Sequence, residues 1–184
     1  MKESYAKETL STASADYVAE QLATDTEVKE LALNECAIQP DSAVKIAAAL
    51  ATNSTLTSLT IDTNDIGDEG AIAFAKALHT NTTLTRLSMD NCKIGVAGCQ
   101  ALGEMLAVNK SLTRLQLQVN YVDDAACDAL SKGLGSNTTL DVLLIGASLR
   151  GKEGSQLSFD KYTALAMYPD GSGAKLGARA VAAA

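Results

Sequence analysis

The stretch Leu84-Thr-Arg-Leu-Ser-Met-Asp-Asn-Cys-Lys-Ile94 carries the pattern that decides the fold. Its apolar residues stand at positions 84, 87, 89, 92 and 94. The same spacing recurs 28 residues later from Leu112, with Asn120 in the place of Cys92, and 28 residues earlier from Leu56. It also begins at Val28 and, in part, at Leu140. A fixed period of this length indicates stacked repeats, each too small to bury its own apolar face.

The residues that follow each of these stretches have the period of an amphipathic helix. Large apolar residues recur at two positions four residues apart, and a small residue stands three positions before the first of them. The three columns are Ile46, Phe74, Leu102 and Leu130; Leu50, Leu78, Leu106 and Leu134; and Ala43, Ala71, Cys99 and Cys127. This i, i+3, i+7 spacing predicts one buried helical face in each repeat.

The repeat reads L-x-x-L-x-L-x-x-N/C-x-I and is followed by a full helix. In this it resembles the leucine-rich repeats of the ribonuclease-inhibitor class, over roughly residues 10–148. The resemblance implies an α/β solenoid with a curved parallel β-sheet on its concave side and α-helices on its convex side. We expect about 4.5 repeats in residues 28–148. They are 28–55, 56–83, 84–111, 112–139 and a partial repeat at 140–148.

The two ends of the chain depart from the repeat. Residues 1–27 are predicted to form an N-terminal half-repeat cap with a helix from Thr12 to Ala23, because Val18 and Leu22 match the helical columns. Residues 1–9 lack the strand leucines. Residues 149–184 form a non-repeat C-terminal tail, which either folds back over the last strand or docks on a partner.

Two polar columns recur with the repeat. The Asn/Cys column holds Cys36, Asn64, Cys92 and Asn120, and we expect it to point inward and to bond the backbone of the turns. The four cysteines are predicted to be free thiols. Asn53, Asn81, Asn109 and Asn137 each begin a glycosylation sequon at the end of a predicted helix. Repeat chemistry explains all four, because asparagine tolerates the left-handed conformation found at helix ends.

Composition excludes several classes of function. The chain has 184 residues, is 47% hydrophobic and carries a net charge of −7 without a basic block, which argues against nucleic-acid binding. No run of about 18 apolar residues exists, so no membrane insertion is expected. The N-terminus also lacks a secretory apolar segment. We therefore expect an intracellular, cytoplasmic protein, with cytoskeletal or ciliary assemblies among its candidate locations.

Residues beside the strand leucines are expected to face the concave surface. This surface begins acidic, has arginines in the middle and ends apolar. Arg86 and Arg114 are spaced to meet an acidic partner, unless Asp62 and Asp90 neutralise them. The candidate partner-binding residues are Glu30, Asn34, Glu35, Asp62, Arg86, Asp90, Arg114, Gln116, Gln118, Val119, Val142 and Leu144 on this face, and Phe159, Tyr162 and Tyr168 in the tail.

Three apolar residues on this face are unusual for a solvated surface: Val119, Val142 and Leu144. We expect either the C-terminal tail or a partner to cover them. The outer helical positions Val44, Ala47, Ile72 and Ala75 are also unusually apolar. They suggest a second contact surface on the convex side.

Catalytic groups are scarce. The single histidine, His79, is expected to be solvated near a helix end. Residues Gly146 to Lys152 match the glycine and lysine positions of a phosphate-binding loop, but Glu153 stands where that loop needs a Ser or Thr for magnesium. We expect no nucleotide, cofactor or metal.

These observations favour a non-catalytic protein–protein interaction module. It would bind a protein partner through the concave strand face, the tail or both, and would suit a small subunit of a larger assembly. The alternative is a regulator of a GTPase or an enzyme, either an activator or an inhibitor of the same repeat class.

Overall fold

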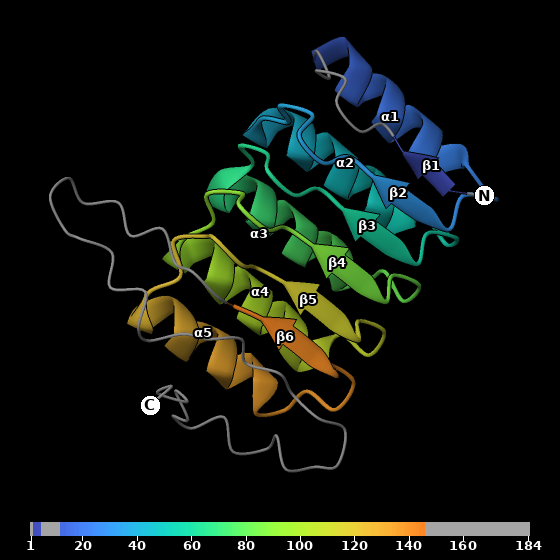
Figure 1. The fold of residues 1–184 in the computed structure, drawn as a ribbon. Coiled ribbons are helices and arrows are strands. Elements are labelled where there is room, and N and C mark those ends of the chain that lie inside the picture. Colours follow the sequence, from blue (N-terminus) through green and yellow to red (C-terminus); the bar gives the residue numbers. More distant parts are fainter. Residues whose placement is uncertain (1, 5–11, 146–184) are drawn as a thin grey trace, which may run out of the picture.

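Strands and helices alternate along the chain in the computed structural model, which describes residues 2–4 and 12–145 (Figure 1). The elements are β1 (Lys2–Ser4), α1 (Thr12–Thr24), β2 (Glu30–Ala32), α2 (Pro40–Thr52), β3 (Ser58–Thr60), α3 (Gly67–Leu78), β4 (Arg86–Ser88), α4 (Val96–Val108), β5 (Arg114–Gln116), α5 (Asp124–Leu134) and β6 (Val142–Leu144).

The strands form one parallel sheet whose spatial order, β1 to β6, is the order along the chain. From β2 onward each strand pairs with the residue 28 positions later, as in Leu31↔Leu59 and Leu87↔Leu115. The sheet makes one layer and the helices make the other, with each repeat stacked on its predecessor (Figure 1). The predicted leucine-rich repeat solenoid is therefore confirmed.

The core lies between these two layers and consists of the repeat columns. Leu59, Leu87 and Leu115 from the strands and Phe74 and Leu102 from the helices are almost fully buried. Burying each such side chain contributes about 1.5–3 kcal/mol to folding. Because every large side chain is shared between neighbouring repeats, the stack is stable where one repeat is not.

Helices α4 and α5 approach until their backbones touch. A Cβ atom added at Gly133 would lie 1.8 Å from the carbonyl oxygen of Gly103, and one added at Gly103 would lie 2.3 Å from that of Ala129. Only glycine fits either position. This contact holds the last helix against the stack.

The asparagines of the four sequons hold successive repeats together, but not by the backbone conformation that the sequence suggested. Asn53 has φ −69° and ψ 131°, which is extended and not left-handed. The reason lies in its side chain: Oδ1 accepts from the N–H of Leu56 at 2.7 Å, and Nδ2 donates to the carbonyl of Leu22 at 2.8 Å. Asn81 repeats this arrangement with Leu84 and Leu50.

The Asn/Cys column forms a second set of bonds between repeats, as predicted. Asn120 Oδ1 accepts from the N–H groups of Cys92 and Ile94 at 2.9 and 3.0 Å, and its Nδ2 donates to the carbonyl of Met89. Asn64 Oδ1 likewise accepts from the N–H groups of Cys36 and Ile38 in the preceding turn. The Cys92 thiol donates to the carbonyl of Ile61 at 3.3 Å. All four cysteines are free, as expected.

The N-terminal cap contains a strand as well as the predicted helix. Helix α1 agrees with the prediction to within one residue, but β1 lies in residues 1–9, where no strand was expected. Glu3 pairs with Leu31 in the register of the sheet and so takes a position where every later strand has leucine. An edge strand needs only backbone hydrogen bonds to pair, and the leucine pattern therefore does not reveal it.

The convex side is less apolar than expected. Val44 and Ile72 are exposed, at 36% and 42%, but Ala47 and Ala75 are almost fully buried and belong to the core. Their placement on the outer surface was wrong. Small residues at these positions let neighbouring helices pack closely.

The same turn position has a positive φ in each of four repeats, and Ala37 and Lys93 add a second such position in two of them. Glu35, Thr63, Asn91 and Val119 form the first column, with φ between 52° and 58°. Left-handed backbone costs an ordinary residue about 1–2 kcal/mol, and asparagine tolerates it best. The β-branched Thr63 and Val119 are therefore strained where Asn91 is not.

We predict that Asn81→Ala lowers the free energy of unfolding by about 2–4 kcal/mol, because it leaves buried backbone N–H and C=O groups without hydrogen-bond partners. Asn81 is only 3% exposed. Urea unfolding followed by circular dichroism measures the loss. Asn137→Ala is the matched control, since its hydrogen bonds are part-buried and its loss should be smaller. Equal losses would contradict a role that depends on burial.

We further predict that Val119→Asn raises the free energy of unfolding by about 1 kcal/mol, because asparagine relieves the positive-φ strain. The reciprocal change, Asn91→Val, should lower it by a similar amount. Urea unfolding of both variants tests the pair. A stability loss in Val119→Asn would show that its apolar contacts outweigh the strain.

Candidate functional site

The concave face of the sheet, which is the side away from the helices, carries the residues on either side of each strand leucine. At its centre lies a hollow of about 230 Å³, which we call the arginine hollow. It spans β3, β4 and β5 and contains three of the predicted site residues, Arg86, Arg114 and Gln116. Its full lining is Ser58, Leu59, Thr60, Arg86, Leu87, Ser88, Arg114 and Gln116.

The two arginines are direct neighbours on this face. Arg86 and Arg114 are register partners on β4 and β5, and both are exposed. The Arg86 guanidinium lies 3.7 Å from Glu30 Oε1, and Arg114 Nε donates to the neutral Gln116 Oε1 at 3.0 Å. Like charges directly opposite each other destabilise a sheet. The two guanidinium groups are like-charged neighbours on adjacent strands.

Asp62 and Asp90 accept hydrogen bonds from backbone N–H groups of the following repeat. Asp90 Oδ2 also accepts from Gln116 Nε2 at 3.4 Å, so the Gln116 amide links this carboxylate to Arg114. Asp62 Oδ1 accepts from the N–H of Asp90 at 2.9 Å, and Asp90 Oδ1 accepts from the N–H of Gln118 at 2.6 Å. Asn34 Oδ1 accepts from the N–H of Asp62 at 2.8 Å in the same way. In the described part of the chain neither aspartate lies within 4.0 Å of an arginine nitrogen.

Burial raises the pKa of Asp90, and the hydrogen bond from the Gln118 N–H acts against this; the neighbouring Asp62 carboxylate raises the pKa further. Two carboxylates on adjacent strands thus sit in a partly desolvated row. Their hydrogen bonds to backbone N–H groups keep them there. Asn34, Asp62 and Asp90 each accept a hydrogen bond from a backbone N–H of the following repeat, close to where the strands end.

Hydroxyl groups complete the polar lining. Ser88 Oγ donates to Asp62 Oδ1 at 2.6 Å. The hydroxyls of Ser58 and Thr60 are half-buried and make no side-chain hydrogen bond within the described residues. Two guanidinium groups and two such hydroxyls make the arginine hollow a donor-rich site suited to an anionic group.

The apolar end of the face comprises Val142 and Leu144 on β6 and Val119 in the turn that follows β5. All three side chains are half-buried. Val142 is the register partner of Arg114, and Leu144 is that of Gln116. The apolar end is therefore continuous with the arginine hollow. Glu30 lies at the opposite end on β2, and Glu35 is exposed in the turn that follows β2.

The tail residues Phe159, Tyr162 and Tyr168 and the stretch from Gly146 to Lys152 lie outside the described residues. The sequence left open whether the tail or a partner covers the apolar end.

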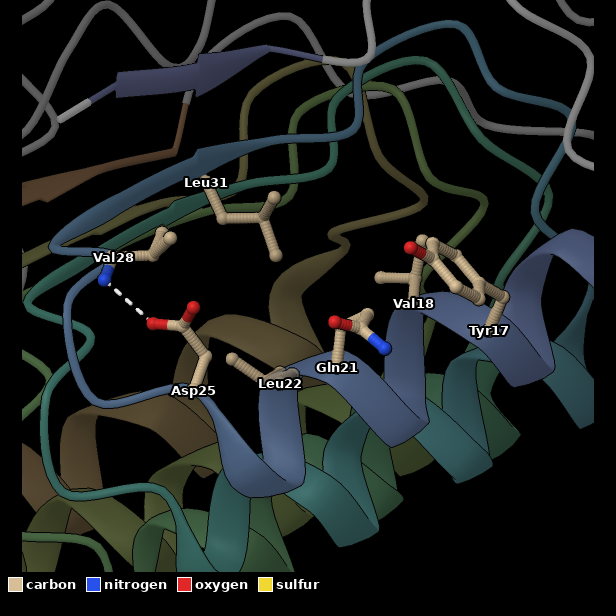
Figure 2. A pocket seen from close by; sticks show the side chains of 7 residues that line it. All are labelled: Tyr17, Val18, Gln21, Leu22, Asp25, Val28 and Leu31. Carbon is tan, nitrogen blue, oxygen red and sulfur yellow. Dashed lines mark hydrogen bonds between the residues drawn. The ribbon is translucent and has the colours of Figure 1, made fainter.

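A second pocket, of about 110 Å³, opens at the N-terminal cap between α1 and β2 (Figure 2). Tyr17, Gln21 and Asp25 line it together with the apolar Val18, Leu22, Val28 and Leu31. The Asp25 carboxylate accepts from the N–H of Val28 at 2.6 Å and thereby caps the turn into β2. Sequence reasoning did not find this pocket.

The reactive side chains of the described part have structural roles. Burial raises the pKa of Cys92 and Cys99 to about 12, and it raises that of Cys127 as well. Thiols of this kind are poor nucleophiles at neutral pH. His79 is exposed at the end of α3, as expected. Among the described residues no three His, Cys, Asp or Glu side chains gather as metal ligands, and no helix is long and apolar enough to cross a bilayer.

Comparison with known proteins agrees with this architecture. The Leucine Rich repeat family matches at residues 52–75 and 80–103. A solved structure described as Leiomodin-1 Actin-Binding Site 2 is 26% identical and superposes with a TM-score of 0.66, over 73% of this chain and 80% of that one.

The tropomodulin C-terminal domain of Caenorhabditis elegans is 15% identical, with a TM-score of 0.61, over 74% of this chain and 83% of that one. It shares the fold. No curated protein matches the sequence. The 28-residue period and full helices are compatible with the ribonuclease-inhibitor-like class. The repeats, the solenoid and these matches together show that the chain has the leucine-rich repeat fold, which supports a role as a protein-interaction module.

Proposed function

We propose that this chain binds a protein partner through the concave face of its sheet, with Arg86 and Arg114 at the centre of the contact. The observation that carries the proposal is the placement of two exposed arginines side by side in a donor-lined hollow. Arginine is enriched among the residues that dominate binding energy at interfaces. An acidic patch on the partner would relieve the repulsion between the two guanidinium groups.

We propose actin as this partner. The support is the similarity to a solved structure that is described as an actin-binding site of leiomodin-1 and that aligns with 73% of this chain. The function is binding and not catalysis, in keeping with the repeat architecture. An intracellular, cytoskeletal location follows from this choice of partner.

The test is binding of the full chain to actin filaments by co-sedimentation and to latrunculin-bound actin monomers by calorimetry. We expect saturable binding to at least one form. Arg86→Ala combined with Arg114→Ala should weaken it by at least about tenfold, because loss of a central interface arginine commonly costs more than about 1.4 kcal/mol.

The matched control is Lys76→Ala combined with Lys132→Ala, which removes the same charge from exposed positions on helices α3 and α5. It should leave binding within about twofold of the parent protein, because rim or remote charges contribute little. If the full chain binds neither form of actin, actin is not the partner. If both double variants bind equally well, the contact lies outside the arginine hollow.

A further inference from the structure

We infer that the concave face recognises an extended peptide segment of the partner in which an acidic residue and an apolar residue stand two positions apart. This inference rests on the proposed function, because it specifies the chemistry of the segment that the concave face would bind. Three observations carry it: the charge of the arginine hollow, the position of the apolar end, and the distance between them.

The acidic position follows from charge complementarity. Arg86 and Arg114 present two guanidinium groups on adjacent strands, with the hydroxyls of Ser58 and Thr60 beside them. The nearby carboxylates of Asp62 and Asp90 are bound to backbone N–H groups of the sheet. A carboxylate between the arginines would gain charge-assisted hydrogen bonds and remove a like-charge contact.

The apolar position follows from the register of β5 and β6. Val142 lies directly beside Arg114, and Leu144 lies directly beside Gln116, so apolar surface begins one strand away from the charge. The half-buried Val119 lies in the turn that follows β5, in a strained backbone conformation. Its strain is not needed for the turn, because Asn91 makes the equivalent turn one repeat earlier.

The spacing follows from the geometry of the sheet. Parallel strands lie about 4.8 Å apart, so the point midway between the two arginines is about 7 Å from the apolar residues on β6. A segment that crosses the strands in an extended conformation advances about 6.6 Å in two residues. Residues i and i+2 of an extended chain also point to the same side. One face of the segment can thus present a carboxylate to the arginines and an apolar side chain to β6.

The test uses the full chain and fluorescein-labelled Gly/Ser peptides in fluorescence anisotropy. One peptide carries a glutamate and a leucine two positions apart, and a second carries the same two residues next to each other. A third has glutamine in place of glutamate. We expect the first peptide to bind at least about tenfold more tightly than either of the others.

Variants assign the two contacts separately. Arg86→Ala combined with Arg114→Ala should abolish the preference for glutamate over glutamine, and Leu144→Ser should abolish the preference for the two-residue spacing. Val44→Ser is the matched control for Leu144→Ser, because Val44 is an exposed apolar residue on the convex helix α2. It should change neither preference.

Three outcomes would overturn the inference. Equal affinity for the two spacings would remove the geometric argument. Absence of peptide binding, together with a loss of thermal stability in Leu144→Ser as large as that of a core truncation, would show that the chain covers its own apolar end. Self-association that Leu144→Ser abolishes, seen by light scattering, would assign that surface to a second copy.

The actin assay separates this inference from the proposed function. If actin binds but the peptide spacing has no effect, the proposed function stands and the inference fails. If the spaced peptide is preferred but actin does not bind, the recognition chemistry stands and actin is the wrong partner.

Discussion

The stack depends above all on buried asparagine amides that join each repeat to the one before it. Where a helix ends and the next strand begins, backbone N–H groups face inward without partners of their own. One amide supplies an acceptor for two of these N–H groups and donates to a carbonyl of the preceding repeat, as Asn81 does with Thr83, Leu84 and Leu50. The Asn81 amide also donates a second hydrogen to the carbonyl of Asn53. A hydroxyl has only one donor and could not make both of these bonds, and an apolar residue could make none. The same amide-to-carbonyl bond recurs in every described repeat, from Asn53 to Leu22, Asn81 to Leu50, Asn109 to Leu78 and Asn137 to Leu106.

This interaction also changes the meaning of the four sequons. Asn53, Asn81 and Asn109 are buried, and their Nδ2 atoms donate to the backbone of the preceding repeat. Glycosylation would require the same nitrogen on the surface. The Asn-x-Ser/Thr pattern here reflects the turn itself, in which the Ser or Thr hydroxyl lies near both the amide and the preceding carbonyl. A motif read without its structural context would give the opposite conclusion.

The sequence predicted the layers, the register and most of the core because all three follow from one periodic pattern of side chains. It did not predict β1, whose pairing uses backbone atoms that the pattern does not describe. It assigned the right asparagines to the turns for the wrong reason, because conformational preference and side-chain bonding both favour asparagine there. It also left the partners of Asp62 and Asp90 open. Whether such a carboxylate bonds to an arginine or to the next strand's N–H depends on the curvature of the sheet, which a repeat pattern does not specify.

Among the described residues, the concave face concentrates energetically unfavourable residues in one region, which spans β4 to β6. Adjacent like charges on β4 and β5 and half-buried apolar side chains on β6 each cost stability, and the other described strands avoid them. Val119 adds a β-branched residue at positive φ, which Thr63 shares in an earlier repeat. Other repeats have less destabilising residues at the equivalent positions. Ser58 stands in the column of Arg86, and Asn91 stands in the column of Val119. The solenoid itself therefore does not require these residues. Local conflicts of this kind gather at functional sites, and their adjacency along the sheet supports the proposal that one peptide segment binds there.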